Sequence, residues 1–81
     1  MTNLEKYNNA FIETFEVSKD ELKDLKYTSI KAWDSIGHML LINAIEAAFS
    51  IMMETDDIID FSSYEKGKEL IAKYKVVIQD V

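Results

Sequence analysis

Residues 33–49 read WDSIGHMLLINAIEAAF, and this segment carries the strongest helical signal in the chain. Asp34 and Ser35 are both favourable N-cap residues, and almost everything that follows them is compatible with a helix. One apolar stripe recurs at helical spacing and consists of His38, Leu41, Ile42, Ile45 and Phe49. The pattern predicts a helix over residues 35–49 that turns this stripe toward the core.

A second set of apolar side chains lies outside the stripe: Ile36, Met39, Leu40 and Ala47. A helix that is apolar on both sides is normally buried all round. A chain of 81 residues has too small a core for that, so we expect part of this face to be exposed for a partner. The alternative is that another helix covers it.

The segment before residue 33 predicts an amphipathic helix and a long loop. Thr2 and Glu5 fit a capping box that opens a helix over residues 3–16. The apolar stripe of this helix consists of Leu4, Tyr7, Phe11, Ile12 and Phe15. From residue 17 to 33 the pattern loosens into a connecting loop with one helical turn, which Ser18 and Glu21 would cap. The residues expected to pin this loop to the core are Leu22, Leu25, Tyr27 and Ile30.

Two further helices are expected after residue 50. An acidic start at residues 55–57 predicts a short helix that ends near Asp60. Its apolar contacts would come from Ile58, Ile59 and Phe61. Ser62 and Glu65 fit a second capping box, which opens a last helix with Tyr64, Gly67, Leu70, Ile71 and Tyr74 at helical spacing. Gly67 costs about 1 kcal/mol relative to alanine within a helix, which indicates a close approach to a neighbouring helix. The tail over residues 76–81 is expected to fray.

Composition favours a single all-α domain. The chain has two glycines and no proline, so few residues interrupt helices. We therefore predict a four-helix bundle over residues 1–81, with three main helices, one short third helix, a long loop between the first two, and a structured core at about residues 3–75. The absence of cysteine excludes disulfides and thiolate metal sites.

The charge balance restricts the partners. Lys and Arg number 9 against 15 for Asp and Glu, which gives a formal net charge of -6. Nucleic acids and anionic membranes are bound through clustered cations, so this balance argues against both and favours a basic partner. The sequence shows neither a secretory signal nor an apolar run long enough to span a membrane, so a cytoplasmic monomer is expected.

Catalytic groups are scarce, and a domain of this size has little room for a deep substrate cleft. His38 is the single histidine, and its place on an apolar stripe predicts a packed, hydrogen-bonded residue rather than a base. Ser35 and His38 lie three residues apart, which does not by itself build a triad with an oxyanion hole. Asp56, Asp57 and Asp60 lack the glycine and terminal glutamate of a calcium loop and predict a solvated helix start. We expect no metal site and no catalytic residue.

The junction at Asp34, Ser35 and Ile36 is the remaining candidate site. A serine at a helix start has an exposed hydroxyl, and the helix N-terminus stabilises negative charge placed on it. A phosphate ester on Ser35 would therefore lie in a favourable field. The Asp-Ser pair alone is also ordinary helix capping.

From about Leu4 to Tyr74 the chain resembles an acyl or peptidyl carrier protein of the phosphopantetheine-binding family. The likeness lies in the order of elements: a helix, a long loop, Asp34-Ser35-Ile36, an apolar helix ending in Glu46 and Phe49, a short helix with an acidic start, and a last helix capped by serine. The family motif is Asp-Ser-Leu, from which this chain departs at Ile36. The resemblance implies that Ser35 carries 4'-phosphopantetheine, and that Asp34 and Ile36 help a phosphopantetheinyl transferase to recognise it.

The resemblance also implies a non-catalytic role. The thiol of the arm would hold an acyl or aminoacyl group as a thioester and present it to activating ligases and to acyltransferase or synthase enzymes. These partners would read the exposed face of the second helix at Met39, Leu40, Asn43, Glu46 and Ala47.

The placement of acidic residues departs from carriers of fatty-acid synthesis, whose second helix is strongly acidic. Here the acidic residues lie instead at Asp20, Glu21, Asp24, Glu54, Asp56, Asp57 and Asp60. This placement argues against primary fatty-acid synthesis. The pattern of Trp33-Asp34-Ser35 with His38 resembles specialised, free-standing bacterial carriers, including D-alanyl and other aminoacyl carriers, and the cargo stays open. A small acidic helical interaction module that is not a carrier is the alternative function.

Overall fold

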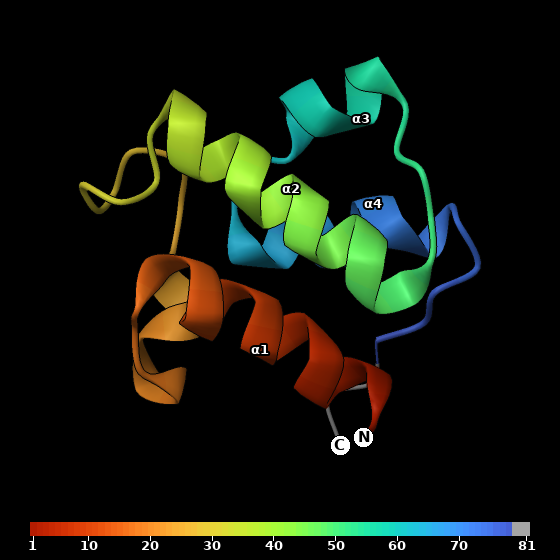
Figure 1. The fold of residues 1–81 in the computed structure, drawn as a ribbon, viewed down its shortest axis with the longest axis horizontal. Coiled ribbons are helices and arrows are strands. Elements are labelled where there is room, and N and C mark those ends of the chain that lie inside the picture. Colours follow the sequence, from red (N-terminus) through yellow and green to blue (C-terminus); the bar gives the residue numbers. More distant parts are fainter. Residues whose placement is uncertain (79–81) are drawn as a thin grey trace.

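The computed structural model describes residues 1–78 and shows an all-α chain (Figure 1). Its α-helices are α1 (Asn3–Phe15), α2 (Ser35–Phe49), α3 (Thr55–Asp60) and α4 (Tyr64–Ala72), and a 3-10 helix, η1, spans Lys19–Asp24. Within residues 1–78 the β-structure consists of one isolated antiparallel bridge between Lys26 and Ser63. The all-α prediction is confirmed, and each helix lies close to where the sequence places it.

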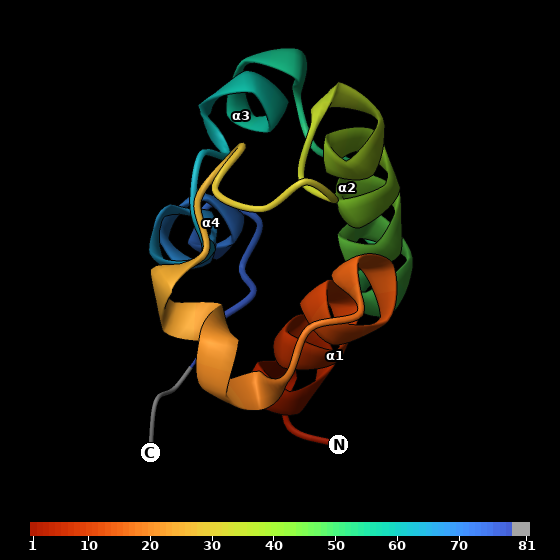
Figure 2. The same ribbon diagram turned by 90° about the vertical axis from the view of Figure 1, so that its left-hand side faces the viewer.

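The helices surround one interior that their side chains fill. In Figure 1, α1 and α2 lie side by side and run in opposite directions. Figure 2 shows α3 at the top of the ring of helices, α4 and η1 on one side, and α1 and α2 on the other. The start of α2 and the short helix α3 therefore lie at the same end of the molecule.

The N-terminal helix begins as the sequence predicts and ends one residue earlier. The Thr2 hydroxyl accepts a hydrogen bond from the Glu5 amide at 3.1 Å, and the Thr2 amide donates to the Glu5 carboxylate at 2.9 Å. Glu16 adopts a left-handed conformation (φ 55°) and ends α1 at Phe15. The single turn predicted near Ser18 and Glu21 is a six-residue 3-10 helix with its own capping box.

The last helix begins one residue later than predicted, because Ser63 and not Ser62 is its N-cap. The Ser63 hydroxyl accepts from the Lys66 amide at 2.9 Å. The Tyr27 amide donates to the Ser62 carbonyl at 2.9 Å, and the Tyr64 amide donates to the Leu25 carbonyl at 3.0 Å. This pairing accompanies an extended conformation of Ser63 and a later start of the helix, which sequence spacing alone could not indicate.

An aromatic core joins α1, α4 and the loop before α2. Phe11 is fully buried, and its ring centroid lies 5.0 Å from that of Tyr7, 5.7 Å from that of Trp33 and 5.2 Å from that of Tyr64. Tyr7 donates to the Tyr64 carbonyl at 2.6 Å, and Tyr64 donates to the buried Asn8 side chain. Burial is the main reason that the pKa of Tyr7 is raised. This cluster fixes α4 against α1.

The predicted contacts of the loop and the short helix are confirmed in part. Leu22 and Leu25 are buried, and Ile30 packs partly buried against the core. Tyr27 is 42% exposed and Ile59 is 70% exposed, so the prediction that their side chains pack on the core is wrong. Tyr27 is held through its backbone amide instead. Phe61, which directly follows the short helix, is fully buried in the core, as the sequence predicts.

Both glycines lie where another group leaves no room for a side chain. A Cβ atom on Gly67 would lie 2.2 Å from Phe61 Cζ and 2.3 Å from the Tyr7 hydroxyl oxygen, which confirms the predicted close approach. A Cβ atom on Gly37 would lie 1.8 Å from the carbonyl oxygen of Ala32, so α2 also starts in close contact with the preceding loop.

The segment after α4 is packed over its described part, contrary to the fraying predicted from residue 76. Val76 is buried, and the Val77 carbonyl accepts from the Asn3 side chain at 3.1 Å. Residues 79–81, the rest of the predicted tail, lie outside the described residues.

Candidate functional site

Ser35 is the first residue of α2, and Asp34 is the residue that caps the helix. The Asp34 carboxylate accepts from the Gly37 amide at 2.8 Å. Of the two predicted N-cap residues, therefore, Asp34 has the capping role and Ser35 does not. Ser35 is exposed, and its hydroxyl makes no hydrogen bond to any residue within 1–78. The hydroxyl is thus accessible to a reagent from outside, while Asp34 is already engaged.

His38 lies one turn after Ser35, and both of its ring nitrogens are engaged. Trp33 is fully buried, and its indole N–H, which can only donate, points to His38 Nδ1 at 3.0 Å. Nδ1 is therefore an acceptor, so Nε2 carries the proton and donates to the Ile58 carbonyl at 2.7 Å. The histidine is a half-buried, hydrogen-bonded residue, as the stripe predicts, and neither nitrogen is directed at Ser35 as a base.

A groove of about 400 Å³ opens beside Ser35, between the start of α2 and α3. Its lining consists of Tyr27, Ser35, His38, Met39, Ile58, Ile59, Phe61 and Ser62. The sequence assigned Tyr27, Ile58 and Ile59 to the core and did not predict a groove. The extreme exposure of Ile59 is visible only once α3 is placed, because its spacing fits a core stripe equally well.

The second apolar face of α2 is open. Ile36, Met39 and Leu40 are 71%, 46% and 56% exposed, and Asn43 and Ala47 are exposed as well. The alternative that another helix covers this face is therefore wrong for residues 1–78. These are the positions at which the sequence predicts contacts with partners.

Glu46 differs from the other predicted partner residues, because it is half-buried and its carboxylate is used within the chain. The carboxylate accepts from the Met53 amide at 2.8 Å and so ties the loop after α2 to the helix. The one acidic side chain in the sequence of α2 is thereby engaged in a structural contact.

Asp57 is buried, although the sequence predicts a solvated helix start at this position. Its carboxylate accepts from the Tyr74 hydroxyl at 2.6 Å and from the Lys73 ammonium at 2.9 Å. The hydrogen bond from Tyr74, together with that from Lys73, lowers the pKa of Asp57. The same contact with Asp57 raises the pKa of Tyr74 and of Lys73. The cluster ties α3 to the end of α4 rather than presenting charge to a partner.

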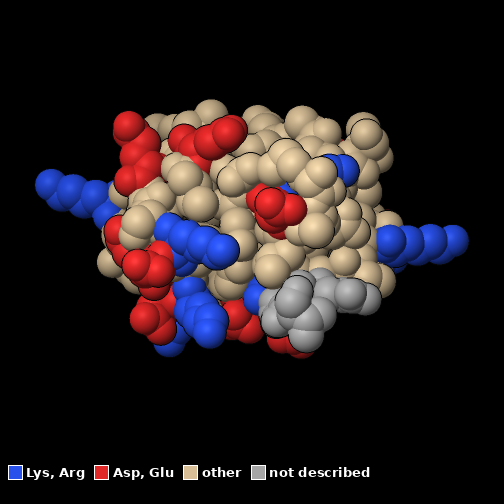
Figure 3. Space-filling model, turned by 90° about the horizontal axis from the view of Figure 1, so that it is seen from below, with Lys and Arg blue, Asp and Glu red and all other residues tan. Residues whose placement is uncertain are grey.

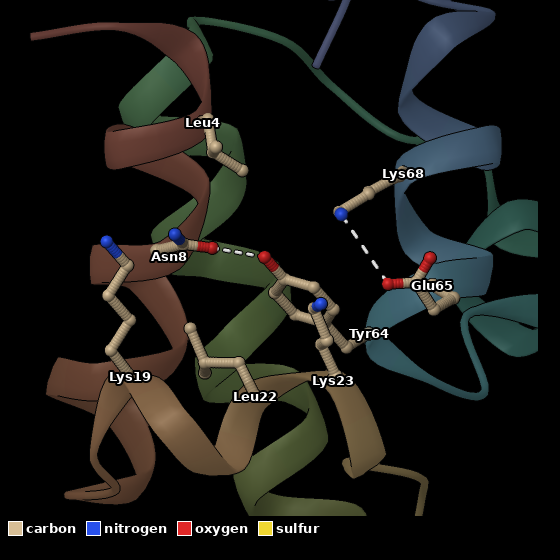
Figure 4. A pocket seen from close by; sticks show the side chains of 8 residues that line it. All are labelled: Leu4, Asn8, Lys19, Leu22, Lys23, Tyr64, Glu65 and Lys68. Atoms are coloured by element: carbon tan, nitrogen blue, oxygen red, sulfur yellow. Dashed lines mark hydrogen bonds and ion pairs between the residues drawn. The ribbon is translucent and has the colours of Figure 1, made fainter. Parts of the chain in front are cut away.

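A second hollow, of about 540 Å³, lies between α1, η1 and α4 and shares no lining residue with the groove beside Ser35 (Figure 4). It is lined by Leu4, Asn8, Lys19, Leu22, Lys23, Tyr64, Glu65 and Lys68. The Tyr64 hydroxyl, on α4, donates to the Asn8 side chain on α1, and Lys68 pairs with Glu65 along α4 at 3.5 Å. Its lining holds a single carboxylate and no histidine, so it lacks the paired acid and base of a hydrolytic site.

On the face seen from below, lysines and acidic residues are interspersed rather than separated into patches (Figure 3). Among the described residues, no three His, Asp or Glu side chains are placed to hold a metal ion. None of the helices in residues 1–78 is both long enough and apolar enough to cross a bilayer.

Comparison of the chain with protein-family models, with curated proteins and with solved structures finds no match.

Proposed function

We propose that the protein is an acyl or aminoacyl carrier whose Ser35 bears 4'-phosphopantetheine. The observation that carries the proposal is the exposed Ser35 hydroxyl, which has no hydrogen bond within residues 1–78 and lies at the first turn of α2 beside an open groove. The order of elements agrees with the acyl-carrier type of bundle, with a long connection before α2 and a short helix after it.

The position of Ser35 favours a phosphodiester at its oxygen. A transferase would form the bond between the Ser35 oxygen and the phosphorus of the pantetheine arm, while the pyrophosphate bond of coenzyme A breaks and the nucleotide bisphosphate leaves. The serine proton would pass to a base on the transferase, because His38 is engaged elsewhere. A negative charge at a helix N-terminus is stabilised by about 0.3–1 kcal/mol. The arm supplies the thiol that this cysteine-free chain lacks.

The surroundings of Ser35 provide for the arm and for partners. The groove between α2 and α3 offers apolar contacts from Met39 and Ile59 to a group that extends from Ser35. Asp34 and Ile36, which is 71% exposed, flank the serine, and the transferase would recognise the serine through contacts with them. Ligases and acyltransferase or synthase enzymes would contact Met39 and Leu40, and the exposed positions Asn43 and Ala47 extend this surface.

The α2 face favours a specialised carrier over a carrier of fatty-acid synthesis. Its exposed side chains are apolar or neutral, and Glu46 is bonded to the Met53 amide. Partner binding would therefore depend more on apolar contacts than on charge pairs. D-alanyl and other aminoacyl carriers fit this pattern, with the cargo open between acyl and aminoacyl groups.

The test is covalent loading followed by mass measurement. Incubation with coenzyme A and a broad-specificity transferase should add the mass of one phosphopantetheine, and Ser35→Ala should abolish the addition. Ser62→Ala is the matched control, because Ser62 lines the same groove and is exposed, and this variant should load like the wild type. A wild-type chain that stays unmodified while a reference carrier reacts would contradict the proposal.

A second candidate is an acidic helical module that binds a basic partner without carrying anything. The exposed apolar face at Ile36, Met39 and Leu40, in a chain of net charge -6, favours it. This function would survive Ser35→Ala and would be lost with Leu40→Ala, so the two variants separate a module from a carrier.

A further inference from the structure

We infer that His38 is the latch that holds α3 across the groove beside Ser35, so that release of its bond to Ile58 frees α3 while the aromatic core stays folded. The meaning of this latch for an attached arm rests on the proposed function. The hold of His38 on α3 itself depends only on contacts within residues 1–78.

The short helix α3 has little of its own to hold it in place. It spans Thr55–Asp60, and an isolated helix of that length is not stable in water. Among these six residues Asp57 is the one that is buried, Ile58 is half-buried and Ile59 is 70% exposed. Apolar burial of α3 is therefore limited to Ile58, which packs partly buried against the core, and hydrogen bonds supply its other attachments.

Those hydrogen bonds attach α3 on two sides. On the side of α4, Asp57 is held by Tyr74 and Lys73. On the side of α2, the Ile58 carbonyl accepts from His38 Nε2 at 2.7 Å, and this is the side on which the groove opens. The bond therefore spans the groove between the helix that bears Ser35 and the helix that forms the opposite wall.

The ends of the segment are fixed independently of the latch. Met53 is buried and its amide donates to Glu46 at 2.8 Å, and Phe61 is fully buried in the core. Loss of the His38 bond would leave both anchors in place. The segment between residues 53 and 61 could then move on the groove side, pivoting on the contact of Asp57 with α4.

The imidazole is held ready for this bond by its neighbours. Its Nδ1 accepts from Trp33, its ring stacks on that indole at an interplanar angle of 16°, and Tyr27 meets it edge-on at 5.5 Å. Trp33 immediately precedes Asp34 and Ser35 in the chain. The loop that precedes Ser35 therefore also orients the His38 ring, through the hydrogen bond from Trp33 to Nδ1.

Two amide substitutions separate the two bonds of His38. The side-chain oxygen of His38→Asn can replace Nδ1 as the acceptor for Trp33, but its short side chain does not reach Ile58. The amide nitrogen of His38→Gln can replace Nε2 as the donor to Ile58. Amide hydrogen exchange of the full, unmodified chain should show α3 exchanging about tenfold faster in His38→Asn, through local opening, with α1 unchanged. In His38→Gln, α3 should keep nearly the wild-type rate.

Two results would overturn the latch: α3 exchange unchanged in His38→Asn, or α1 and α3 amides loosening together to the same extent. Should His38→Asn fail to fold, the wild type itself provides the test. Its α3 amides should exchange through an opening with a weaker denaturant dependence than that of α1, and an equal dependence would count against the latch. Because these measurements use the unmodified chain, they stand apart from whether Ser35 accepts an arm.

Discussion

The contact between α1 and α4 (called here the rigid side) and the contact between α2 and α3 (the open side) are maintained by different interactions. Between α1 and α4, fully buried rings and two buried hydrogen bonds join Tyr7, Asn8 and Tyr64. Between α2 and α3, one partly buried bond from His38 spans an open groove. We expect the first contact to be the more rigid, because its hydrogen bonds are buried and water cannot readily replace them, and the second, whose bond is only partly buried, to open at a lower free energy.

For the proposed carrier function, the two contacts would have different roles: one would stabilise the fold, and the other would border the groove for the arm. If Ser35 carries an arm as proposed, the core would have to survive repeated docking with other enzymes, and its aromatic packing would provide that stability. The groove beside Ser35 would have to accommodate an arm and its cargo. A polar bond that can be broken without disturbing Phe11 or Trp33 meets that requirement better than a buried apolar contact would.

The largest expected difference in the free energy of unfolding is between truncation of a side chain in the aromatic core and truncation of one on α3. Phe11→Ala should lower the free energy of unfolding by about 3–5 kcal/mol, because it removes a ring at the centre of the buried cluster. Ile59→Ala, at an exposed position of α3 beside the groove, should change it by less than about 0.5 kcal/mol. Denaturant titration measures both. Comparable losses in the two variants would show that α3 is as firmly packed as the core.

A smaller change in the free energy of unfolding is expected from Gly67→Ala, which adds one methyl group where α4 meets the core. Alanine at position 67 should gain about 1 kcal/mol of helix propensity. Its Cβ would nevertheless meet Phe61 at 2.2 Å and Tyr7 at 2.3 Å, and neither buried ring can move aside. We therefore expect Gly67→Ala to be destabilising by about 1–3 kcal/mol, the usual range for overpacking.

Thermal unfolding measures the loss in Gly67→Ala, and Glu69→Ala on the exposed face of the same helix is the control for propensity. A stabilised Gly67→Ala would mean that the contact between α4 and the core is looser than the distances indicate.

The sequence predicts features within single helices better than contacts between distant segments. Caps and stripes depend on neighbours three or four residues away, so the Thr2 capping box, the stripe of α2 and the close approach at Gly67 can be read from the sequence. The position of Ser35 at a helix start is predicted in the same way, whereas its role as an attachment site comes from the family resemblance and stays a prediction.

The errors fall where contacts between distant segments decide the outcome. Pairing of residue 26 with residue 63 moved the cap of α4 from Ser62 to Ser63. Bonds from Tyr74 and Lys73 buried Asp57, and the placement of α3 exposed Ile59. None of these contacts has a local pattern. The groove beside Ser35, which depends on all of them, was therefore beyond prediction from spacing.

The smallest expected effect is a pH dependence that comes from the attachment of α3 to α4. Because the pKa of Asp57 is lowered in the folded chain, its bonds to Tyr74 and Lys73 contribute stability above the unfolded pKa of an aspartate. That contribution should be lost as the pH falls through the lowered, folded-state value. Stability measured from neutral to acidic pH should therefore decline less steeply in Asp57→Asn than in the wild type, whereas the exposed control Asp56→Asn should follow the wild type.

Hydrogen exchange would show whether this loss is confined to α3. If acid frees α3 from α4 before the core unfolds, α3 amides should lose protection at a higher pH than α1 amides. An identical acid profile in Asp57→Asn and the wild type would mean that the carboxylate does not hold α3. The contrast between the two sides would then depend on His38 alone.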